Sequence, residues 1–207
     1  MNNEYIYIVL VKALTGLGQF SRMITKYEYS HIAVCLDEKL EDFVTFSRRK
    51  HYSPFNAGFM HEKREHYAFG ENKKVKVKVF KVPVTKENKA RITDYIADIE
   101  DDKEYVFNIY SMITMPFIHG FKIYKAHNCM SFTAKIIELS DCVQMDKPYY
   151  KYNIPEMDEL LSKFKYKEGY LKKKQEDYEY MQKESVVCNV KRFVELNGKL
   201  MGRMFWK

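Results

Sequence analysis

The chain lacks most of the features that would indicate a secreted, metal-binding or membrane-spanning protein. Its 207 residues include four cysteines, with no CxxC pair and no paired spacing of the metal-binding type. Residues 1–12 have neither the basic start nor the small-residue cleavage site of a signal peptide. No apolar run approaches the ~20 residues that span a bilayer. These absences predict a cytoplasmic protein with reduced thiols.

Phosphate-binding and zinc motifs are also missing. Gly16 and Gly18 are followed by neither a third glycine nor a Gly-Lys-Ser/Thr triplet, so they indicate a turn. His61 and His66 lie five residues apart, whereas the HExxH motif needs a four-residue spacing to place both histidines on one helix face. We therefore expect no metal and no cofactor.

The charge is basic but dispersed. Thirty-five Lys and Arg against 28 Asp and Glu give a net charge of +7. No nucleic-acid recognition motif accompanies this charge, so no specific nucleic-acid partner is expected. Weak binding to anionic surfaces through the basic tail, residues 171–207, is the interaction that the charge favours.

The pattern of apolar residues predicts an α+β domain over residues 1–170 and a helical C-terminal extension over residues 171–207. The stretch between residues 49 and 72 reads as a polar loop that overhangs a cleft. Strands are predicted at residues 5–11, 31–36, 41–48 and 74–82, and helices at 19–25, 85–101, 105–117, 129–139 and 156–164.

One of these helices carries the residue with the clearest chemical potential. Asn128 is a favourable N-cap, and Phe132, Ile136 and Leu139 follow at helical spacing. Cys129 then lies in the first turn, where free backbone N–H groups and the helix dipole favour a thiolate. A thiolate there becomes a useful nucleophile when a neighbouring base accepts its proton.

His31, at the start of a predicted strand, is the best candidate for that base. The returning strand carries Thr45 and Ser47 on the face that His31 shares if the connecting loop has an odd number of residues. A three-residue loop centred on Glu38 puts Thr45 opposite His31, and one centred on Lys39 puts Ser47 there. Either side chain can orient the imidazole by a hydrogen bond, and Thr45 is the first choice.

Four short motifs in this order resemble the circularly permuted branch of the NlpC-type papain-like cysteine hydrolases, which includes the lecithin–retinol acyltransferase-like proteins. In that branch the histidine strand precedes the cysteine helix, as His31 precedes Cys129 here. The resemblance extends over roughly residues 5–172. Its motifs are Tyr29-Ser30-His31-Ile32-Ala33-Val34, Thr45-Phe46-Ser47-Arg48-Arg49-Lys50, Ala57-Gly58-Phe59 and Asn128-Cys129-Met130-Ser131-Phe132.

The resemblance implies an antiparallel sheet or small barrel packed against the cysteine helix. It implies Cys129 as nucleophile, His31 as general base and Thr45 at the third polar position, where the absence of charge would leave an imidazolium less stabilised. Ser47 and Asn128 become possible orienting or oxyanion residues. The implied substrates are peptides, other amides or lipid esters. Tyr29 and Tyr124 are further candidates for lining the cleft.

Three classes of function follow from the sequence. The first is a cysteine hydrolase or acyltransferase. The second is a catalytically inactive papain-like fold that binds a peptide or lipid. The third is a basic module that binds nucleic acid or a membrane surface through residues 171–207. The pH dependence of alkylation at Cys129 separates the first from the second, and the salt dependence of binding identifies the third.

Overall fold

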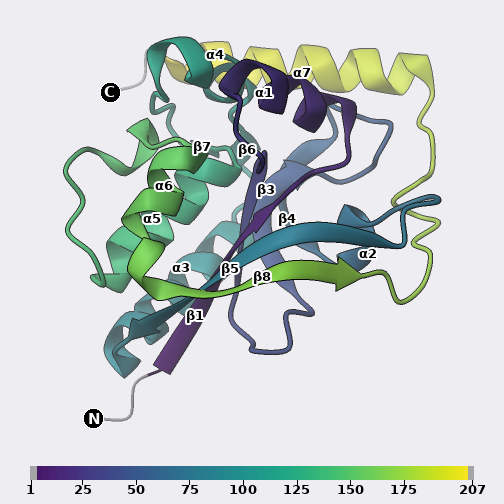
Figure 1. Cartoon of the computed structure of the whole chain (residues 1–207). Helices are drawn as coiled ribbons and strands as arrows, with labels where there is room; N and C mark the ends of the chain where they lie inside the picture. Colours follow the sequence, from purple (N-terminus) through teal and green to yellow (C-terminus); the bar gives the residue numbers. More distant parts are fainter. Residues whose placement is uncertain (1–3, 205–207) are drawn as a thin grey trace.

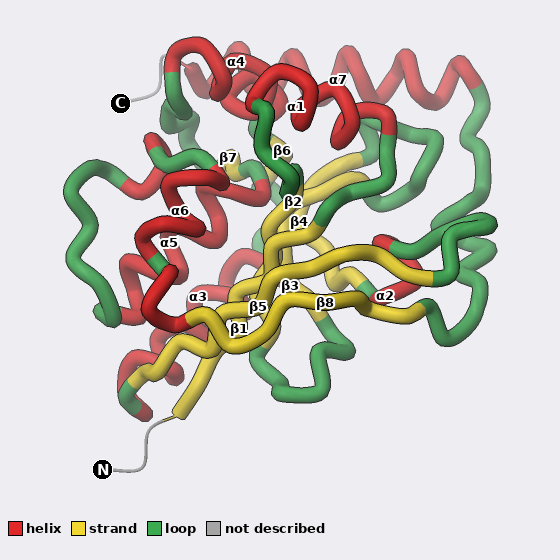
Figure 2. Tube along the Cα trace, viewed as in Figure 1, coloured by secondary structure: helices red, strands yellow, loops and turns green. Residues whose placement is uncertain are grey.

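A six-stranded antiparallel sheet forms the centre of the molecule, with helices on its faces and around one end (Figures 1 and 2). The computed structural model describes residues 4–204, apart from the side chains of residues 17 and 116. Over this range the α+β class is confirmed, and the sheet is open rather than closed into a barrel. In chain order the elements are β1 (Glu4–Val11), α1 (Gly16–Thr25), β2 (His31–Cys35), β3 (Phe43–Arg48), β4 (Ala57–Glu62), α2 (Arg64–Tyr67), β5 (Lys74–Val84), α3 (Lys86–Asp101), β6 (Val106–Phe107), α4 (Ile109–Ile118), β7 (Ala126–His127), α5 (Cys129–Ser140), α6 (Ile154–Leu160), β8 (Lys165–Lys172) and α7 (Val186–Met204).

The strand order is β4-β3-β2-β1-β5-β8, so the first strand of the chain lies in the interior of the sheet. β1 pairs antiparallel with β2 on one side and with β5 on the other. Its continuous apolar run from Ile6 to Val11 is fully buried, as expected for a strand that is covered on both faces.

Alternation along β1 divides the core into two layers. Ile6 and Ile8 pack with α3, α5 and α6, while Tyr7 and Val9 face the opposite layer, which includes Tyr67 of α2. Successive side chains of a strand point to opposite faces, so a single strand supplies both layers.

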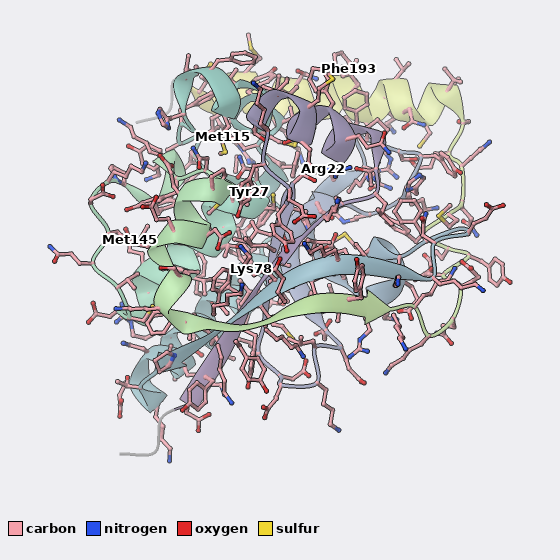
Figure 3. The ribbon with its side chains drawn as sticks, viewed as in Figure 1. Arg22, Tyr27, Lys78, Met115, Met145 and Phe193 are labelled. Atoms are coloured by element: carbon pink, nitrogen blue, oxygen red, sulfur yellow. The ribbon has the colours of Figure 1, made fainter. Side chains whose placement is uncertain are left out.

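The helices on the first layer begin at or within two residues of the predicted starts. The Thr85 side chain accepts a hydrogen bond from the backbone of Asn88, and Ile92, Ile96 and Ile99 of α3 are buried in the core. Pro155 lies in the first turn of α6, where its missing N–H costs no helical hydrogen bond. Asp158 of α6 contacts Tyr27 and Lys78, which Figure 3 labels near this helix.

Two stretches differ in kind from their prediction, and several element ends are also shifted. α1 begins at Gly16 rather than at residue 19, α4 begins at Ile109 rather than at residue 105, and α6 spans Ile154–Leu160 rather than residues 156–164. Residues 49–72 contain the paired strand β4 and the short helix α2, so this stretch is not simply a polar loop. Residues 165–172 form the edge strand β8 on β5, and the predicted domain boundary near residue 170 falls inside it. Both strands are polar sheet edges, and their pairing with a neighbour compensates for a weak apolar pattern.

The C-terminal segment runs back along the body before it forms α7. Tyr180 is buried, and its carbonyl accepts a hydrogen bond from the backbone of His51, while Asp177 contacts His66. Leu196 and Leu200 of α7 pack on the small β6–β7 sheet. The helical part of the predicted extension is therefore α7; residues 205–207 lie outside the described range. None of the helices within residues 4–204 combines the length and apolar character needed to cross a membrane.

Candidate active site

Cys129 is the first residue of α5, as predicted. The Asn128 side chain accepts a hydrogen bond from the backbone N–H of Ser131 at 2.8 Å, and the Ser131 hydroxyl accepts one from the Asn128 backbone. This reciprocal cap fixes the start of the helix. The Cys129 thiol is partly exposed at the helix end that carries the positive partial charge.

The His31 side chain interacts with the Cys129 thiol, and a carboxylate holds the imidazole in place. Its Nε2 lies 2.8 Å from Oε2 of Glu62, the last residue of β4. The two side chains are 13% and 5% exposed, so the pair is shielded from water. Because Nε2 is engaged with Glu62, Nδ1 is the nitrogen left to exchange a proton with Cys129.

The electrostatics of the pair favour a charged imidazole. Burial by itself lowers the pKa of His31, but the Glu62 carboxylate and the Cys129 side chain outweigh burial and raise that pKa to about 10. Burial by itself raises the pKa of Glu62, yet the imidazole and then Ser47 and Tyr67 hold it at about 2. At neutral pH the site therefore holds an imidazolium beside an ionised carboxylate.

Thr45 does not occupy the third position that the sequence assigned to it. Its side chain is fully buried, and its hydroxyl donates to the carbonyl of Ile32 at 3.1 Å. Val34 pairs with Val44, which is the register of a turn centred on Lys39, the second of the two predicted arrangements. Glu62 takes the orienting place and supplies the negative charge that threonine lacks.

Ser47 supports the carboxylate by a hydrogen bond. Its hydroxyl donates to Oε1 of Glu62 at 2.5 Å, so the two carboxylate oxygens bind Ser47 and His31 separately. The Tyr67 ring lies 5.8 Å from the imidazole ring, which restricts the space around it. Cys129, His31, Glu62 and Ser47 therefore form a chain of four groups, each of which interacts with the next.

The remaining predicted site residues divide into two groups. Asn128 and Tyr29 line a cavity beside Cys129. The side-chain oxygen of Asn128 accepts the hydrogen bond of the helix cap, and the Tyr29 hydroxyl donates to Glu168 at 2.8 Å. Tyr124 is 45% exposed, and neither of the cavities described below includes it in its lining.

Two cavities meet at the Cys129 thiol. The α6-side cavity, of about 400 Å³, reaches the start of α6, and the α2-side cavity, of about 380 Å³, reaches His31, Glu62 and the residues around α2. Cys129 and Ser30 belong to the walls of both cavities. A substrate can therefore extend to both sides of the sulfur atom, as the two halves of a cleaved amide or ester require.

Cys35 and Cys142 have surroundings suited to inert thiols. Cys35 is fully buried in the second core layer, where burial and the Asp37 carboxylate raise its pKa to about 12. Burial also raises the pKa of Cys142. Residues 4–204 contain no cluster of three or more His, Cys, Asp or Glu side chains arranged to hold a metal ion.

Glu62 is the functional residue that the sequence did not reveal. A strand continued from Gly58 places Met60 and Glu62 on one face by simple alternation, and β3 pairs with this strand from Phe43–Glu62 to Arg48–Ala57. That alternation was the available signal. It was weak because Ala57, Gly58 and His61 do not form an alternating apolar pattern.

Comparisons of the chain with family models, with curated proteins and with solved structures gave no match.

Proposed function

We propose that this protein is a cysteine hydrolase or acyltransferase of the permuted papain-like type. The observation that carries the proposal is the buried His31–Glu62 pair at the Cys129 thiol, at the start of a capped helix. Support comes also from the order of the parts: the histidine strand precedes the cysteine helix, and that helix packs against the antiparallel sheet.

The reaction is acyl transfer through a thioester. His31 holds the thiol proton on Nδ1, and the Cys129 sulfur attacks the carbonyl carbon of an amide or ester. When the C–N or C–O bond breaks, His31 delivers the proton to the leaving amine or alcohol. Water or another acceptor, losing its proton to His31, then attacks the thioester and regenerates Cys129. Glu62 keeps the imidazole oriented and stabilises its charged form.

We assign two groups to the stabilisation of the developing oxyanion. The backbone N–H of Cys129 is one of the unpaired donors of the first turn of α5. Ser30 lies in the wall shared by both cavities, and its Oγ accepts from Nη1 of Arg22 at 3.1 Å. The Ser30 hydroxyl can then direct its own proton into the cleft. We assign Ser30 as the second donor.

The decisive experiment measures the rate of iodoacetamide alkylation of each cysteine against pH by peptide mapping. We expect Cys129 to react well below the pH at which ordinary thiols do, and a His31→Ala variant to lose this advantage. Cys35 and Cys142 serve as internal controls in the same sample, because burial raises the pKa of both. Incubation with activated esters should add one acyl group at Cys129, seen by intact mass.

An ordinary thiol profile at Cys129 in both proteins, with no acyl adduct, contradicts the proposal. The fold would then be a binding scaffold for a peptide or lipid.

A further inference from the structure

Apolar side chains gather on three helices at one end of the molecule. α1, α4 and α7 lie together at this end, which Figure 1 shows at the top. Among the described side chains, the exposed large apolar residues other than tyrosine all belong to these three helices. They include Met23 of α1, Phe117 of α4 and Val190 of α7. Figure 3 labels Met115 on α4 and Phe193 on α7 at this end. We call this surface the three-helix face.

In α7 the apolar side of the helix is only partly covered by the rest of the protein. One edge of its apolar side is used for packing, through Leu196 and Leu200 in the β6–β7 cluster and through the Phe193 ring, whose centroid lies 4.9 Å from that of Phe55. At 100° per residue, Val186, Val190 and Val194 lie on an arc next to that edge, and each is more than half exposed. A solvent-facing helix normally carries polar residues there, so this arc is available to a partner.

The charges of the same helices are mostly positive. Segments 16–26, 109–118 and 186–204 contain six Lys or Arg against one acid, Glu195, whereas the rest of the chain has 29 against 27. These segments therefore hold five of the seven net positive charges. Lys26, Lys191 and Lys199 are exposed beside the apolar residues. Arg192 is already paired with Glu184, and Lys191 lies 3.8 Å from Oε1 of the exposed Glu195.

We propose that the three-helix face docks on an anionic lipid bilayer surface. A helix with an exposed apolar arc bordered by lysines is suited to lie in the headgroup layer, with its apolar side buried and its charges at the anionic surface. A second copy of this chain fits less well, because two such faces would bring like charges together. The face also borders the cleft, since Phe20 and Ile113 line the α2-side cavity and Phe117 lines the α6-side cavity.

The test is co-sedimentation of the full chain with vesicles of phosphatidylcholine alone and of phosphatidylcholine mixed with phosphatidylserine. We expect binding to the mixed vesicles that weakens as salt is added. Val190→Ser combined with Val194→Ser should weaken binding at least about tenfold, because two apolar contacts are lost. Lys191→Glu combined with Lys199→Glu should weaken it by more than about fivefold.

Matched controls are Tyr170→Ser and Lys172→Glu on β8, which should bind as the wild type does. Cys129→Ala should also bind normally, so docking is measured independently of catalysis. Circular dichroism of each variant verifies the fold. The proposal is overturned if the wild type ignores the mixed vesicles, or if the α7 variants bind as tightly as the controls. If the wild type does not bind vesicles but forms dimers, and the α7 variants do not, the three-helix face binds a second copy of the chain and the proposal is likewise overturned.

Discussion

Two largely shielded histidines, His31 and His127, have opposite electrostatic character. The pKa of His31 is raised to about 10, whereas that of His127 is lowered to about 4. Burial lowers both values. His127 has only hydroxyl partners, Tyr95 and Ser131, each at 3.2 Å, and the nearby Lys135 disfavours its charge further.

His31 differs because it has Glu62 at 2.8 Å. The contrast shows that closeness to Cys129 in sequence does not decide which histidine carries a charge at neutral pH. A buried carboxylate does so, because only a negative charge outweighs the cost of desolvating an imidazolium. His127, although two residues from the thiol, is a neutral part of the core.

The largest effect should come from removing His31, and removing His127 provides the matched comparison. His31→Ala removes the proton carrier, and we expect thioester formation at Cys129 to fall by about 10²–10⁴-fold. His127→Gln keeps a polar group of similar size and should leave the rate within about tenfold. Rapid-mixing measurements of acyl-enzyme formation compare the two. A loss of equal size in both variants would contradict the assignment.

A smaller loss is expected when the carboxylate is neutralised. Glu62→Gln retains the shape of the side chain but removes the charge, so the imidazolium is no longer favoured. We expect acyl-enzyme formation to slow by about 10–10²-fold and the pH profile of Cys129 alkylation to move toward that of an ordinary thiol. Ser47→Ala, which removes only the support to Oε1 of Glu62, should have a weaker effect in the same direction. Unchanged profiles in both variants would argue against Glu62.

The two histidines should also leave separate marks on stability against pH. His31 has a folded pKa above its ordinary value of 6.5, so its stabilisation is present below pH 6.5 and is lost as pH rises toward 10. His127 has a folded pKa below 6.5, so its contribution falls as pH decreases from 6.5 to 4. Urea unfolding across this range should show a flatter alkaline limb in His31→Gln and a flatter acidic limb in His127→Gln.

Glu62 also contributes to the pH dependence of stability, on the acidic side. Its folded pKa of about 2 lies below the ordinary 4.5, so stabilisation of the pair is lost between pH 4.5 and 2, a range that overlaps that of His127 only near pH 4.

The smallest effect is expected at Thr45. Thr45→Val keeps the volume and removes one hydrogen bond to the carbonyl of Ile32. We expect a loss of about 1 kcal/mol in the free energy of unfolding and no change in Cys129 reactivity. Chemical denaturation and the alkylation assay measure these separately. A catalytic defect in this variant would restore the role first assigned to Thr45.

The sequence by itself determined the local features. Asn128 and the apolar stripe after it place Cys129 at a helix start, and the run from Ile6 to Val11 makes a buried strand. The position of His31 at the start of its strand was predicted as well. These features depend on neighbours within a few residues along the chain, where caps and periodicity are legible.

Tertiary structure alone decided the identity of the residue behind the histidine. Glu62 reaches His31 and Ser47 only when β4 pairs with β3, and nothing in its neighbouring residues signals a buried charge. Its partners are 31 and 15 residues away in the chain. A carboxylate remains buried only where distant groups compensate its charge, so its role depends on the assembled sheet.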